Sequence, residues 1–304
     1  MKPTLFWKNF QLGKELDISG NFIYHGMFVF DQMDSFFHEE EIFEMLYNLS
    51  VGIERLQKIA IILYDHDETD TSFNFKEFEK NLKSHHHCKL MDRIKKHENL
   101  VFEKECNRFL GILDLFYNKF RYFGYSFASI DEQKNEQHEL VSFIEKYVSV
   151  KISYGMKQNT SITDSMRQFM YRVIDTIVHS IFRLIELKAY ELNIYTTELN
   201  YKSKAYKIYK AREMSFKNEN QYRKEILLNL LDPINFETAR NLLRKTAYTK
   251  LNEYHTNYYI KNLLNIHKCR EGMEELNSIE EEISTSLNDL GFIGNEHIYI
   301  DEQG

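Results

Sequence analysis

Prolines and glycines are scarce in this chain, and that scarcity constrains its fold more than any other feature. Only two prolines and eleven glycines occur among 304 residues. Sheet proteins need turn residues about every eight to twelve positions, and these two residue types are the strongest markers of turns. Hydrophobic residues make up 43% of the sequence, which is enough to build a core of domain size. The sequence therefore predicts an all-α protein of long helices joined by short polar loops.

Apolar residues recur at helical spacing through the first half of the chain. The clearest run lies at 39–64, where apolar residues follow one another at steps of three and four. Other long helices are predicted at 20–37, with Ser19 as the N-cap, and at 103–122. Shorter helices are expected at 75–82, at 88–97 and up to about residue 150.

A polar segment at 154–161 is the best candidate for a domain boundary. We therefore predict a helical bundle at 1–154 and a second helical region of unknown role at 155–304. The second region is expected to contain helices at 161–193, 196–213, 221–231, 236–264 and 271–287, and a short extended piece at 298–300.

Charge and cysteine content narrow the class of protein. The net charge of −7 argues against a generally basic nucleic-acid-binding surface and leaves room for a local basic face. Cys88, Cys106 and Cys269 are far apart and form no C-x-x-C pair, so neither a disulfide framework nor a cysteine-rich zinc site is expected. Charged residues interrupt every long apolar stretch, which argues against a membrane span. We expect a cytoplasmic protein that makes no contact with a membrane.

Three adjacent histidines, His85, His86 and His87, precede Cys88 and invite a metal-binding interpretation. Adjacent residues cannot all face one tetrahedral centre, so we expect exposed histidines at a helix entrance and no metal or other cofactor. His85 or His87 can still serve as a hydrogen-bonding or proton-transfer group.

Arg172 and His179 have an R-x6-H spacing inside a predicted helix. This spacing is almost two full turns, so both side chains point the same way. A guanidinium that holds a phosphate beside an imidazole that moves a proton suits ribonuclease chemistry. An ion-paired Arg172 and a His179 packed on a helix face would give the same pattern.

Charged residues interrupt the most apolar predicted helix at Glu54, Arg55 and Lys58. Glu54 and Lys58 are an i, i+4 pair of favourable polarity, which an exposed helix surface also explains. In the middle of this helix, the three charges either line a cleft that binds RNA or lie on the one wet face of the helix.

Aromatic residues surround Arg121 at the end of the predicted helix 103–122. An arginine near a helix C-terminus interacts favourably with the helix dipole, which is a sufficient structural reason for it. Tyr117, Tyr122 and Tyr125 would also suit stacking on bases beside a cation. Aromatic residues at helical spacing also occur in protein cores, so both interpretations stay open.

Three short pieces of the first half resemble HEPN-like proteins. They are the run NLSVGIERLQK at 48–58, the helix entrance Ser84-His85 and the helix end Phe120-Arg121-Tyr122. In HEPN-like modules a helix carrying Glu-x-x-x-Lys precedes a short segment with a histidine, and a later helix carries the signature arginine. The resemblance covers about residues 19–130. It implies an up-and-down helical bundle.

Active HEPN proteins are metal-independent ribonucleases that pair across a dimer, and many serve as toxins or in antiphage defence. Their signature is R-x4-6-H on one helix, and by position the arginine here is Arg121. No histidine occurs between Arg121 and His138, so the chain departs from the signature. Either Arg172 and His179 provide the pair, or one of His85–His87 substitutes in space, or the module binds without cleaving.

The resemblance leads to the hypothesis of a HEPN-like protein of a prokaryotic defence or toxin–antitoxin system. It would form a homodimer or join a partner subunit, and it would cleave RNA without a metal. Arg121 or Arg172 would hold the scissile phosphate. His179, His85 or His87 would assist proton transfer. The alternative is a non-catalytic helical adaptor or regulatory subunit that binds a protein partner, which the broken signature and the mild acidity favour.

Overall fold

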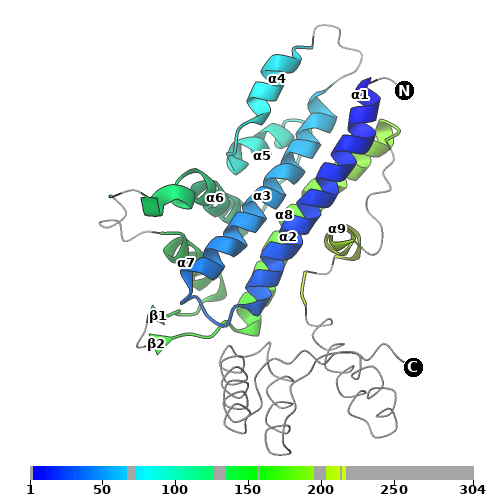
Figure 1. Cartoon of the computed structure of the whole chain (residues 1–304). Coiled ribbons are helices and arrows are strands. Elements are labelled where there is room, and N and C mark those ends of the chain that lie inside the picture. The colour runs from blue at the N-terminus through cyan, green and yellow to red at the C-terminus, as the bar shows by residue number, and fades with distance from the viewer. Residues whose placement is uncertain are drawn as a thin grey trace, which may run out of the picture. The chain divides into compact units, whose positions relative to one another are not determined.

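The computed structural model describes residues 3–66, 73–125, 127, 135–155, 158–194, 203–212 and 214–216. The chain divides into two compact units, Met1–Ser215 and Phe216–Gly304. The first unit extends past the boundary that we predicted between residues 154 and 155. Within the described residues the secondary structure is almost entirely helical (Figure 1), which confirms the all-α class. The predicted elements beyond residue 216 lie outside the described residues.

The N-terminal helix is longer than predicted. The short helix α1 (Pro3–Phe6), the π-helical segment η1 (Trp7–Gln11) and α2 (Leu12–Gln32) follow one another without a break. Ser19, the predicted N-cap, lies inside α2 and is fully buried. The N-cap prediction is wrong because the helix begins well before Ser19. The Ser19 hydroxyl instead donates to the carbonyl of Gly52 on the next helix, at 2.7 Å.

Helix α3 (Glu39–Asp65) lies antiparallel to α2 and forms the centre of the unit. Two glycines allow the close approach of these helices. A Cβ atom on Gly26 would lie 2.7 Å from Leu49 Cγ, and one on Gly52 would lie 2.6 Å from Ile23 Cγ1. The predicted run 39–64 is confirmed as this helix, and its apolar stripe is buried in the core.

The middle of the chain packs on the other side of α3 (Figure 1). It consists of α4 (Phe75–Leu82), α5 (His87–Lys95), α6 (Lys104–Asn118), the 3-10 helix η2 (Phe120–Tyr125) and α7 (Glu136–Val148). Helix α6 ends earlier than the predicted helix 103–122, and residues 120–122 of the predicted helix belong to η2 instead. Asn74 and Asn135 cap α4 and α7 with their side chains, which fixes where these helices begin.

A hairpin of β1 (Tyr154–Gly155) and β2 (Gln158–Asn159) occupies the polar segment that we predicted as a domain boundary. Thr163 then caps α8 (Asp164–Glu191), which packs on α3 through fully buried Ile174, Ile177 and Ile181. The burial of α8 against α3 explains why the first compact unit continues beyond the hairpin.

The last described helices are α9 (Lys204–Tyr206) and the π-helical segment η4 (Lys207–Ala211), which pack on α2 and α8. Tyr209 is buried there, stacked on Phe182 with ring centroids 4.7 Å apart, and its hydroxyl lies 2.7 Å from Ser19 Oγ. Among the helices that the structure describes, none combines the length and the apolar character needed to span a bilayer.

Candidate functional site

Glu54 and Lys58 form a shielded charge pair in the middle of α3. Lys58 Nζ lies 2.6 Å from Glu54 Oε1, and the two side chains are only 21% and 9% exposed, respectively. The predicted i, i+4 pair is therefore present, but it lies under other side chains rather than on an open helix surface. Ionised groups in such a place need close partners, because removal from water is costly for a charge.

His85 supplies the third member of this cluster. It lies in the connection between α4 and α5, and its Nδ1 atom is 3.1 Å from both carboxylate oxygens of Glu54. The His85 side chain is 47% exposed, so it joins the shielded pair to the surface of the protein. This imidazole is one of the two that we considered for proton transfer.

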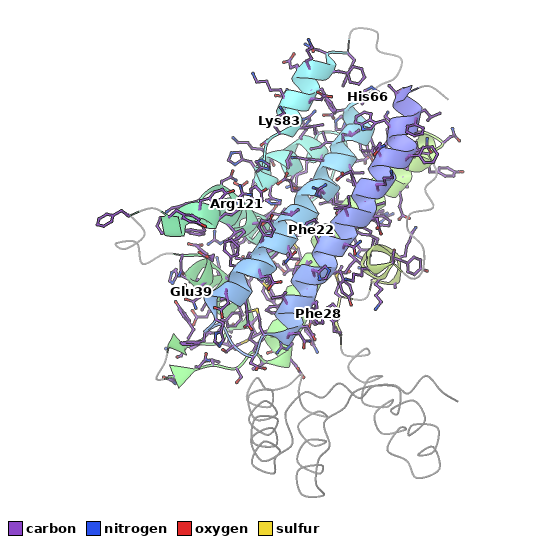
Figure 2. The ribbon with its side chains drawn as sticks, viewed as in Figure 1. Phe22, Phe28, Glu39, His66, Lys83 and Arg121 are labelled. Carbon is purple, nitrogen blue, oxygen red and sulfur yellow. The ribbon has the colours of Figure 1, made fainter. Side chains whose placement is uncertain are left out.

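Arg121 approaches the same group of residues from η2. Its guanidinium carbon lies 4.0 Å from the ring centroid of Tyr117 and 4.5 Å from that of Tyr122. The Tyr117 ring also lies against the His85 ring, with centroids 4.9 Å apart. Figure 2 shows Arg121 and Lys83, which is close to His85 in sequence, on the side of α3 that faces away from α2. We call Glu54, Lys58, His85, Tyr117 and Arg121 the α3–α6 cluster.

The guanidinium of Arg121 has no acidic partner among the residues that the structure describes. Within the described part of the chain, no carboxylate forms an ion pair with it, and no acceptor bonds to its buried Nε atom. Arginine stays charged at any working pH and presents donors in a planar fork that matches a phosphate. An arginine that contacts two tyrosine rings and has no carboxylate partner in the described part of the chain is suited to bind an anion.

The charged residues of the α3–α6 cluster affect the pKa of the Tyr117 phenol. Burial raises its pKa, the nearby Glu54 carboxylate raises it further, and the Arg121 guanidinium opposes the rise. Tyr117 therefore stays neutral and serves as a surface for Arg121 and His85 rather than as an acid or base. Its contact with His85 was not predicted, because nothing in the sequence indicates which residues α6 brings to the α4–α5 connection.

Arg55 and Tyr122 were also predicted to take part in RNA binding. Arg55 lies apart from the α3–α6 cluster, and Tyr122 lies at its edge. Arg55 forms an ion pair with Glu15 on α2 and lies 6.0 Å from the ring of Phe22, so it takes part in the α2–α3 contact. Tyr122 covers one face of Arg121 and is 63% exposed, so it is accessible to a ligand.

His87 is a core residue in this structure. Its side chain is completely buried, and its Nδ1 atom lies 3.1 Å from Gln57 Oε1. Gln57 in turn donates to the His87 carbonyl at 3.0 Å. Burial lowers the pKa of His87 to about 4, against weaker opposing effects of Glu54 and Asp114. A neutral imidazole without solvent access cannot contact a substrate, so the catalytic role that we considered for His87 does not fit its position.

Arg172 and His179 have separate partners. Arg172 is 67% exposed and lies 4.0 Å from Glu105 on α6. Both ring nitrogens of His179 lie close to oxygen atoms: Nδ1 is 2.8 Å from Asp175 Oδ1, and Nε2 is 3.0 Å from the carbonyl oxygen of Tyr209. The two residues are about 10.5 Å apart along the axis of α8. The structure therefore gives them the ion-paired and packed arrangement that the spacing also allowed.

No group of three or more histidine, cysteine or acidic side chains among the described residues could hold a metal ion. Burial raises the pKa of the Cys106 thiol to about 11, so this cysteine is a small apolar core residue. Cys269 lies outside the described residues.

Comparison with models of protein families, with curated proteins and with solved structures gave no match to this chain.

Proposed function

We propose that the chain is a HEPN-like protein of a prokaryotic defence or toxin–antitoxin system and that it cleaves RNA without a metal. The observation that supports this most is that Arg121 and the accessible imidazole of His85 both pack on the ring of Tyr117, and that Arg121 has no carboxylate partner among the described residues. Both residues belong to the segments that resemble HEPN-like proteins. In this proposal the pair takes the place of the R-x4-6-H signature, which is missing at Arg121.

In the proposed reaction, Arg121 binds the scissile phosphate and stabilises the charge that builds on its oxygens. His85 accepts the proton of the ribose 2′-hydroxyl, and O2′ bonds to phosphorus. The bond from phosphorus to O5′ breaks, and O5′ takes a proton from water. The products are a 2′,3′-cyclic phosphate and a 5′-hydroxyl. Exposed Tyr122 is available for contact with a base.

The test is cleavage of a fluorogenic oligoribonucleotide by the purified full chain in excess EDTA. Arg121→Ala and His85→Gln should each lower the rate by about 10² to 10⁴, the usual cost of losing a group of this kind. Arg172→Ala is the matched arginine control, because Arg172 is exposed and paired with Glu105. It should cleave at the wild-type rate. Loss of activity in Arg172→Ala and His179→Gln, with Arg121→Ala unaffected, would move the site to α8.

The second candidate function, a non-catalytic adaptor, is favoured by a different observation. Tyr122, Tyr125 and Phe127 are 63%, 91% and 84% exposed in and directly after η2, which is an unusual concentration of exposed aromatic side chains. Such residues also anchor protein interfaces. A chain that cuts no RNA with or without added metal, and whose Arg121→Ala and His85→Gln variants still bind a partner protein, would support this function and rule out the ribonuclease.

A further inference from the structure

The position of Glu54 gives this residue a role that the HEPN resemblance does not assign. Both of its oxygens lie 3.1 Å from His85 Nδ1, and Lys58 Nζ lies 2.6 Å from one of them. Because it pairs with an ammonium group, the carboxylate accepts hydrogen bonds and donates none. Nδ1 must then carry a hydrogen, since a bare Nδ1 would place two lone pairs face to face.

We infer that Glu54 is a positioning residue that holds neutral His85 as the Nδ1–H tautomer and so leaves a lone pair on Nε2. The Tyr117 ring restrains the imidazole from a second direction, with ring centroids 4.9 Å apart. No described residue bonds to Nε2, and the His85 side chain is 47% exposed. The nitrogen left to accept a proton is therefore the one that a ligand can reach.

The chemical consequence of this arrangement rests on the proposed ribonuclease function. As O2′ bonds to phosphorus, its proton moves to the Nε2 lone pair, and His85 becomes an imidazolium that keeps its Nδ1–H on Glu54. The carboxylate takes no proton in this step; its charge stabilises the imidazolium and its position orients the ring. Lys58 Nζ lies 2.6 Å from the same carboxylate and helps to hold it in place.

The direct test is the tautomer of His85 in the full chain, measured by long-range proton–nitrogen correlation with ¹⁵N-labelled histidine. The spectrum is recorded near pH 9, well above the ordinary histidine range, and the His85 signals are assigned by their loss in His85→Gln. We expect a protonated Nδ1 and a bare Nε2 in the wild type. A wild-type spectrum with the proton on Nε2 would overturn the inference, and this measurement needs no Glu54 variant.

Glu54→Met keeps the length of the side chain and removes the acceptor, so we expect a mixture of both tautomers in its spectrum. Glu44→Gln, at an exposed glutamate of the same helix, is the control and should keep the wild-type pattern. In the EDTA assay Glu54→Met should lower kcat about 10- to 100-fold, the usual effect of losing an orienting partner, with KM within about twofold. Unchanged tautomer signals in a folded Glu54→Met protein would overturn the inference.

The two proposals fail in distinguishable ways. If the wild type cuts no RNA, the ribonuclease function is wrong, and the tautomer of His85 still decides whether Glu54 positions it. If the wild type cuts RNA and Glu54→Met retains full kcat, the function stands and the role given to Glu54 in catalysis is wrong.

Discussion

Acidification should destabilise this protein through His87, whose imidazole is completely buried against Gln57. The pKa of His87 is about 4 in the folded protein, compared with an ordinary value of 6.5. In the unfolded chain His87 therefore takes up a proton below about pH 6.5, whereas in the folded protein it stays neutral until about pH 4. Stability from this residue is fully present above pH 6.5 and is lost as the pH falls towards 4.

The magnitude follows from the pKa difference, since one unit corresponds to about 1.4 kcal/mol. Between pH 7.5 and pH 5, His87 should lower the free energy of unfolding by about 2 kcal/mol, and the full loss below pH 4 is about 3 kcal/mol. Because the group is completely buried, solvent screening does not reduce these figures.

Urea unfolding followed by circular dichroism at pH 7.5 and pH 5 measures this loss. In His87→Gln, which keeps a polar side chain beside Gln57, the loss between the two pH values should be about 2 kcal/mol smaller than in the wild type. His86→Gln is the matched control, because the His86 side chain is 39% exposed, and it should keep the wild-type loss. An equal loss in His87→Gln and the wild type would refute the assignment to His87.

Four further outcomes are expected. Gly52→Ala should destabilise the protein by about 1–3 kcal/mol in urea unfolding, because the added Cβ would lie 2.6 Å from Ile23 Cγ1. Gly111→Ala should stabilise α6 by up to about 1 kcal/mol, because the added Cβ would meet no atom within 4 Å. Ser19→Ala should cost about 1–3 kcal/mol in the same assay, because the buried Tyr209 hydroxyl loses its partner. Light scattering at tens of micromolar should give the mass of a homodimer or of a complex with a partner subunit; a monomer mass with no partner co-purifying would contradict this.

The composition and the periodicity of the sequence were enough to predict the fold class and the main helices. The run of apolar residues at 39–64 became α3, and the expected helix 161–193 became α8 with a start three residues later. Both outcomes depend on neighbours along the chain, which a sequence displays directly. The pairing of Glu54 with Lys58 was predictable for the same reason, since four residues make about one helical turn.

Predictions that depended on contacts between residues far apart in the sequence succeeded less well. Ser19 has the chemistry of an N-cap, but it is buried inside α2, because the close approach at Gly52 offers its hydroxyl a carbonyl on α3. His85 and His87 are two positions apart, yet one is accessible and the other belongs to the core. The start of α5 at His87 turns that side chain towards α3, and the sequence shows no difference between the two histidines.

The sequence by itself determined the all-α class, the positions of the main helices and the residue types available near Arg121. The tertiary structure alone decided that His85 reaches Glu54, that Tyr117 contacts both His85 and Arg121, and that Arg121 has no carboxylate partner among the described residues. The reason is physical: a helix is stabilised by contacts three and four residues apart, whereas a site of this kind depends on how separate helices pack, and packing is set by the shapes of buried surfaces far apart in the chain.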